Sequence, residues 1–230
     1  MASTPEAREA HENAQVVGES RLPMAVAVLV AIVLTILLPT EHRALPQVPE
    51  GVVPLIEGAL LIALIAGDPG AIDRRTRQLR AVSIALVSLL VLSALWATVR
   101  LIDALITGGA ATNSAGDLLE AGSIVWTGNV LAFALLYWEL DSGGSAARAH
   151  HSRRVVDFAF PQQMNPDLAP MGWRPLFIDY LYLAYTNATA LSPTDAMPTA
   201  AWAKIAMTVQ SLISLAILGL VIARAVNVFT

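Results

Sequence analysis

The residues of this sequence that are best suited to chemistry lie between Asp179 and Pro198, in the stretch DYLYLAYTNATALSPTDAMP. Carboxyl, amide and hydroxyl oxygens are dense there, in an otherwise apolar chain, and such oxygens can bind a cation or pass on a proton. Two further polar residues come from the next apolar segment, which we expect to pack beside this stretch. The candidate pathway or polar-core residues are Asp179, Tyr182, Tyr185, Asn187, Thr189, Ser192, Thr194, Asp195, Gln210 and Ser214.

Spacing places part of this set on one side of a helix. Asp179, Tyr182 and Tyr185 recur at intervals of three residues, so they share a helical face. The stretch 176–192 is short for a membrane span and contains many polar residues, so its contact with lipid would be unfavourable. We therefore predict that it is packed inside a helical bundle, with its polar face toward neighbouring helices.

The composition defines the setting of these residues. The chain has 230 residues, of which 56% are hydrophobic and 14% are charged, whereas soluble domains carry about 25% charged residues. This predicts an all-α integral membrane protein with one membrane domain, residues 23–230, after a flexible polar tail, residues 1–22. The tail lacks the features of a cleaved signal peptide. The predicted spans are 23–39, 52–66, 81–106, 118–140, 176–192 and 201–229.

Several polar residues interrupt the other spans. Glu57 lies near the start of the second span, where we predict an interfacial position. Arg100 and Asp103 are three residues apart and are expected to pair on one helix face. Asn129, in the middle of the fourth span, should form a hydrogen bond with a neighbouring helix and serve packing. At the end of that span, Tyr137 and Trp138 indicate an aromatic belt at the membrane interface.

The distribution of basic residues favours six complete spans. With both termini inside, every Lys and Arg except Arg43, Arg100 and Lys204 falls on the cytoplasmic side, as the positive-inside rule requires. A re-entrant segment 176–192 that enters from outside reverses this distribution. A segment that re-enters from inside also satisfies the rule, but it places the C-terminus outside. The expected location is the inner membrane of a bacterium, with both termini cytoplasmic.

The last third of the chain resembles an uncharacterised family of bacterial multi-pass membrane proteins. The resemblance rests on Asp157-Phe158-Ala159-Phe160-Pro161, the segment DYLYLAYTNAT, the residues from Ser192 to Asp195, and a final apolar helix that ends in Ala225-Val226-Asn227. It implies a multi-pass architecture and brings no known activity.

A second resemblance, over about the last 45 residues, is to the pore region of potassium channels. Ala188-Thr189 is similar to the end of the pore helix, and Ala190-Leu191-Ser192-Pro193-Thr194 occupies the place of the ion filter. Asp195, Pro198, Trp202 and Lys204 fall at similar positions. The filter glycines are replaced by Ser192 and Thr194, and Pro193 fixes its own φ, so a filter of the usual geometry is not expected.

These patterns leave two functions open: an ion or small-solute pathway, and a non-conducting structural or partner-binding membrane protein. The expected partners are the lipid bilayer and a monovalent cation, with no nucleic acid. A fourfold pore would need a homo-oligomer, whereas a six-span carrier could act alone. The chain has no cysteine and none of the common catalytic motifs, and His150 and His151 are too few for a closed metal site. We therefore predict no enzyme activity, no cofactor and no metal.

Overall fold

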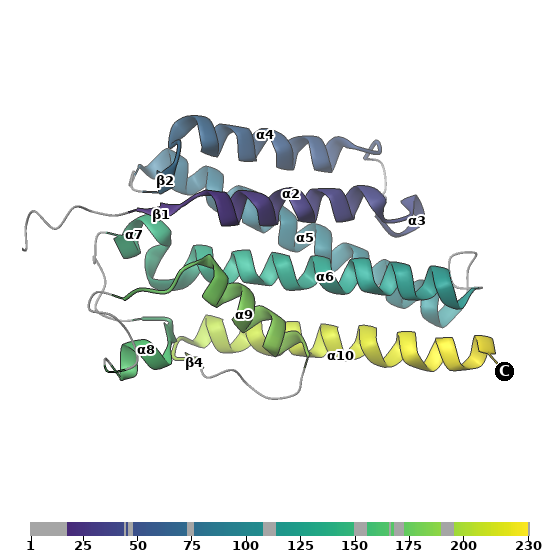
Figure 1. Cartoon of the computed structure of the whole chain (residues 1–230). Coiled ribbons are helices and arrows are strands. Elements are labelled where there is room, and N and C mark those ends of the chain that lie inside the picture. Colours follow the sequence, from purple (N-terminus) through teal and green to yellow (C-terminus); the bar gives the residue numbers. More distant parts are fainter. Residues whose placement is uncertain are drawn as a thin grey trace, which may run out of the picture.

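The long helices lie side by side in a bundle in the computed structural model (Figure 1). The structure describes residues 18–43, 45, 48–72, 76–107, 114–149, 156–165, 167, 173–189 and 196–229. The long helices are α2 (Leu22–Leu37), α4 (Val52–Gly67), α5 (Arg77–Thr107), α6 (Ala115–Leu140) and α10 (Ala201–Phe229). The all-α class predicted from the sequence is confirmed.

The short elements gather mainly at one end of this bundle. Two antiparallel pairs lie there, β1 (Glu19–Ser20) with β2 (Ala71–Ile72) and β3 (Phe158–Ala159) with β4 (Met197–Pro198). The end where α2, α5 and α10 begin is called the strand end below (Figure 1). The helical turns beside the strands are η2 (Asp141–Gly143), α7 (Ser145–Ala149) and α8 (Pro161–Met164). The turn α3 (Thr40–Arg43) lies at the opposite end (Figure 1).

The outer surface of the bundle is apolar, as expected for contact with lipid. Leu29, Leu55, Leu92 and Leu215 are among the exposed side chains. In length and composition, α5, α6 and α10 are each suited to crossing a membrane. Helices α2 and α4 have 16 residues each, which corresponds to about 24 Å and is somewhat less than the ~30 Å hydrocarbon core.

Helix α6 is the central helix of the bundle. It packs against α2, α5, α9 and α10, so side chains on most of its circumference are covered by protein. For this reason the predicted interfacial belt is wrong: Tyr137 and Trp138 are 0% and 1% exposed. The Trp138 indole packs edge-on against Phe177 and donates a hydrogen bond to Glu19. A central position fits the mean hydropathy of the α6 span, 1.4, which is lower than the 2.3 of the α5 and α10 spans.

Helix α9 (Phe177–Ala188) occupies the predicted fifth span but is much shorter. Its 12 residues correspond to about 18 Å, well below the thickness of a bilayer core. It begins at the strand end and stops part of the way along α10 (Figure 1). Strand β3 precedes α9 and β4 follows it, and the two pair with Phe158 opposite Pro198. Both ends of this segment therefore lie at the strand end, and a full crossing by 176–192 does not fit this geometry.

The end of the predicted polar tail is part of the folded bundle. Glu19 and Ser20 form β1, and Glu19 and Arg21 are 8% and 6% exposed. The flexible-tail prediction is wrong for these residues, because both charged side chains find buried partners in elements that are distant in the sequence.

Candidate functional site

The predicted polar face of α9 does not point into the bundle. Tyr182 and Tyr185 are 58% and 50% exposed, and Asp179 accepts a hydrogen bond from the backbone N–H of Leu176 (2.7 Å). Asp179 is thus the third residue of α9, and its carboxylate caps the start of the helix by accepting the N–H of the N-cap residue, Leu176. The buried face carries Tyr180 and Asn187 together with apolar residues, because that face packs on α6 and α10. The prediction of a buried Asp179–Tyr182–Tyr185 face is therefore wrong.

Other predicted residues do meet in the interior. The Asn187 amide donates to Gln210 Oε1 (2.7 Å) and to the Met207 carbonyl. Tyr137 also donates to Gln210 Oε1 (2.7 Å), and the Ser211 hydroxyl donates to Asn187 Oδ1 (2.9 Å). We call Tyr137, Asn187, Gln210 and Ser211 the amide clasp. The clasp joins α6, α9 and α10 through neutral groups that satisfy one another, which is the pattern of a packing network.

Of the remaining predicted residues, two lie in the described part of the chain and three do not. Thr189 donates to the Thr186 carbonyl (2.9 Å) at the end of α9. Ser214 is buried on α10, one turn beyond the clasp. Ser192, Thr194 and Asp195 lie outside the described residues, as does the whole filter-like segment 190–194.

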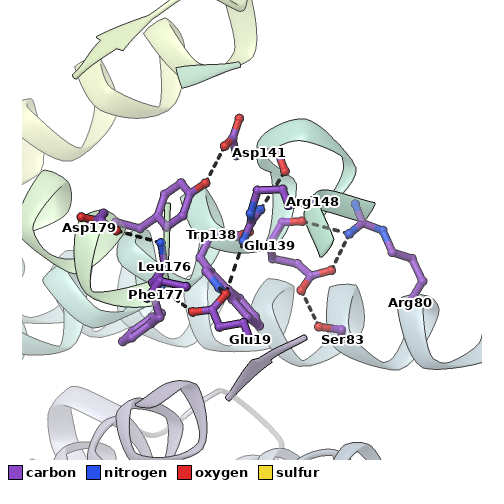
Figure 2. A network of polar contacts seen from close by, with 11 residues as sticks. Glu19, Arg80, Ser83, Trp138, Glu139, Asp141, Arg148, Leu176, Phe177 and Asp179 are labelled. Carbon is purple, nitrogen blue, oxygen red and sulfur yellow. Dashed lines mark hydrogen bonds and ion pairs between the residues drawn. The ribbon is translucent and has the colours of Figure 1, made fainter. Parts of the chain in front are cut away.

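A charged network that the sequence patterns did not predict lies at the strand end (Figure 2). Glu19 accepts hydrogen bonds from the Trp138 indole (2.8 Å) and from the backbone N–H of Phe177. Arg148 lies 3.9 Å from Glu19 and donates to the carbonyls of Trp138 and Asp141. Burial raises the pKa of the Glu19 carboxyl, and the two hydrogen bonds and Arg148 oppose that rise.

Asp141 is the hub of the same network. Its Oδ2 accepts the Tyr180 hydroxyl, and its Oδ1 accepts the backbone N–H groups of Asp157 (3.0 Å) and Phe158 (3.2 Å). The Arg148 guanidinium lies over the Tyr180 ring, 5.0 Å from its centroid. The hub therefore joins η2, β3 and α9, and it holds the start of α9 next to the end of α6.

Two ion pairs border a cavity of about 380 Å³ at the strand end. Arg80 Nη1 contacts Glu139 Oε1 (2.9 Å), and Ser83 donates to Glu139 Oε2 (2.6 Å). Arg21 pairs with Asp68 at 3.1 Å, and burial lowers the pKa of the Arg21 guanidinium while Asp68 opposes this effect. We call this space the Arg80 cavity; α4, α5 and α6 contribute to its walls.

A second cavity of about 310 Å³ opens toward the other end of the bundle. Helices α2, α4, α5 and α6 line it, mostly with Leu, Val, Ala and Pro. Ser93 is one of its few polar residues, and we call it the Ser93 cavity. The Ser93 hydroxyl donates to Glu57 Oε1 (3.2 Å).

Glu57 itself is completely buried between α4 and α5. It is 0% exposed, and its Oε2 has no hydrogen-bond partner among the residues that the structure describes. The predicted interfacial depth stays a prediction, and the carboxyl points to α5 and is covered by protein. A small residue, Gly58, follows it in the sequence, but no local pattern indicated a partner on α5.

The two cavities lie on the same seam between α4, α5 and α6. Along α5, Leu90 lines the Ser93 cavity and Ser83 lines the Arg80 cavity. These seven positions correspond to a barrier of about 10 Å. Leu86 and Val87, which are 1% and 4% exposed, fill it. Along the seam, a polar cavity at the strand end is followed by an apolar barrier and then by an apolar cavity. The wall residue Ser93 of this second cavity binds the buried Glu57 carboxyl.

Within the described part of the chain, no three His, Asp or Glu side chains are grouped closely enough to hold a metal ion. No family model, curated protein or solved structure matches this chain.

Proposed function

We propose that this protein is a membrane carrier or pore for a small solute or ion, and that its path follows the seam between α4, α5 and α6. The observation that carries the proposal is the pair of cavities at opposite ends of this seam, separated by about 10 Å. Volumes of about 310 and 380 Å³ are in the range of small-molecule sites. Alternating access requires an opening toward each side of the membrane and a thin barrier between the two openings. The two cavities and the barrier between them have this arrangement.

The proposed topology has five crossings, by α2, α4, α5, α6 and α10, and a half-crossing by α9. Non-helical backbone at membrane depth is tolerated where protein covers it or where it lines a cavity. The amide clasp and the Asp141 hub supply such cover for α9, which supports a re-entrant segment. This replaces the six complete spans expected from the sequence.

The orientation follows from the basic residues. By the bounds of the elements that contain or adjoin them, the basic residues of the strand end are Arg21, Arg77, Arg80, Arg148, Arg174 and Lys204, and those of the opposite end are Arg43, Arg100 and Arg224. By the positive-inside rule the strand end is cytoplasmic. We propose that the C-terminal end of α10 is outside and that α9 re-enters from the cytoplasm of a bacterial inner membrane.

The potassium-channel resemblance points to a different path, between subunits and around residues 190–194. Helix α9 ends at Ala188, where the resemblance places the end of a pore helix. The seam path is favoured because both of its cavities and the barrier between them lie within one chain.

Reconstitution in liposomes tests the seam path. Gly128 lines the Ser93 cavity, and a Cβ added there meets no heavy atom within 4 Å. Gly128→Leu should therefore fill the cavity and abolish uptake of any transported cation, proton or amine. Gly219→Leu on α10 is a matched control, because its Cβ also meets open space and Gly219 lines neither cavity.

Two outcomes would reject the path. Normal uptake by the Gly128→Leu protein would exclude the Ser93 cavity as part of it. The absence of uptake for every solute tested would favour the non-conducting, structural reading.

A further inference from the structure

The lining of the Ser93 cavity restricts the chemistry of a ligand. Its walls are apolar, with Trp96 as the aromatic member and Thr35 and Ser93 as hydroxyl donors. None of the described residues that line it is basic, and Glu50 at the mouth is the charged one. Such a cavity excludes anions and favours a compact ligand with a large apolar surface.

The Glu57 carboxyl is not part of the cavity lining but is joined to it through Ser93. Val53 and Pro54 line the cavity, and Glu57 is one helical turn further along the same face of α4. Ser93 belongs to the cavity wall and also donates to Glu57 Oε1. The second carboxyl oxygen, Oε2, has no partner in the described part of the chain. A completely buried carboxyl with one free oxygen is costly as an anion unless a cation neutralises it.

None of the described residues provides that cation next to Glu57. On α4, the described residues include no Lys or Arg. On α5, the nearest basic residue on the same side of the barrier is Arg100, which pairs with Asp103 at 3.6 Å. His42 on α3 is another titratable group at this end; it is buried against α5 and is not part of the cavity lining. Asp117 and Glu120 on α6 and Arg224 on α10 lie at this end too, and none of the three lines the cavity. The neutralising charge must come from a proton or from a ligand.

We propose that the Ser93 cavity binds a lipophilic monovalent organic cation, such as a protonated or quaternary amine, in exchange for a proton on Glu57. When the cation enters, the proton leaves the carboxyl for water, so the charge of the site is unchanged. The apolar walls take up the hydrocarbon part of the ligand, and Trp96 can contact the cationic group through its ring face. The proposal deepens the proposed function, on which it rests for the role of the cavity in transport, but binding is measured without transport.

Benzyltrimethylammonium is a suitable probe because its charge does not change with pH. Its uncharged counterpart of the same shape is neopentylbenzene. Binding of both to the purified full-length protein in detergent should be measured by equilibrium dialysis between pH 5 and 9. Over the range in which Glu57 is protonated, the dissociation constant of the cation should fall about tenfold per pH unit, with release of one proton per ligand bound. Binding of neopentylbenzene should not change with pH.

Two isosteric variants locate the exchange. Glu57→Gln should remove the pH dependence and weaken cation binding about tenfold or more. Glu50→Gln, at the mouth, should leave the pH dependence unchanged. Equal binding of the two probes, no proton release from the wild-type protein, or loss of the pH dependence in Glu50→Gln alone would each overturn the proposal. If the cation binds as expected but no uptake occurs in liposomes, the inference stands and the proposed transport function fails.

Discussion

Removal of the Tyr180 hydroxyl tests whether the Asp141 hub holds α9 in place. Tyr180 is completely buried, and its hydroxyl donates to Asp141 Oδ2. In Tyr180→Phe the ring remains, so its packing against Phe160 (5.4 Å between centroids) and its contact with Arg148 (5.0 Å) are retained. The change therefore isolates one hydrogen bond to a buried carboxylate.

The expected loss is the contribution of a hydrogen bond to a charged group. Such bonds stabilise proteins by about 1.5–3 kcal/mol. Asp141 Oδ2 has no other described donor, whereas Oδ1 keeps the backbone N–H groups of Asp157 and Phe158. We expect Tyr180→Phe to lower the free energy of unfolding by about 2 kcal/mol. Combined with Asp141→Asn, it should show a coupling energy of at least about 1 kcal/mol.

Equilibrium unfolding in mixed micelles of dodecylmaltoside and sodium dodecyl sulfate, followed by tryptophan fluorescence, measures these differences. Tyr182→Phe is the matched control, because this tyrosine lies on the same helix but is 58% exposed. It should change the free energy of unfolding by less than about 0.5 kcal/mol. If Tyr180→Phe is as stable as Tyr182→Phe, or if the two sites prove additive, the hub does not fix α9.

Three further changes have defined outcomes in the same unfolding assay. Gly144→Ala should cost more than Gly70→Ala by at least about 1 kcal/mol, because both glycines have positive φ but only at Gly144 would the added Cβ lie 1.8 Å from Arg80; equal losses would contradict this. Gln210→Leu should cost at least about 2 kcal/mol, since it leaves the buried Tyr137 hydroxyl without an acceptor and removes one of the two acceptors of the Asn187 amide; a neutral effect would refute the clasp. Because the pKa of Glu19 is raised in the folded state, its protonated carboxyl stabilises the fold fully below pH 4.5. This contribution is lost as the pH rises through the folded-state pKa. Glu19→Gln should flatten that slope, and an unchanged slope would assign it to another group.

Features set by short spacing could be predicted from the sequence. Arg100 and Asp103, one turn apart, form the expected pair at 3.6 Å. Asn129 has the expected partner on a neighbouring helix, because its amide donates to the Thr98 hydroxyl on α5 at 2.7 Å. An isolated amide in an apolar span must find such a partner, so the sequence alone indicates its role. The long helices could also be predicted, because each of them corresponds to a long run of apolar residues in the sequence.

The charged sites could not be predicted, because their partners are distant in the sequence. Glu19 receives the N–H of Phe177 across 158 positions, and no local pattern in the polar tail indicates this. Glu57 looked interfacial because its depth along α4 was visible in the sequence, whereas the position of Ser93 on α5 was not. The orientation of α9 could not be predicted either. Its tyrosines suggested a polar face toward the interior, whereas the opposite face of α9 packs on α6 and α10, so Tyr182 and Tyr185 are exposed.

The pairing of β3 with β4 has a consequence for the order in which this chain can be assembled in a membrane. Because Phe158 and Pro198 meet at the strand end, α10 can be inserted as a crossing helix directly after α6, without prior passage of the segment between them. In the topology proposed above, helix α9 can then enter its place later, from the face on which it was synthesised, once α6 and α10 are present to receive it. During biosynthesis, the placement of α9 would then depend on α6 and α10 being in the membrane and not on the insertion machinery. A truncation that removes α10 should therefore leave α9 at the membrane surface.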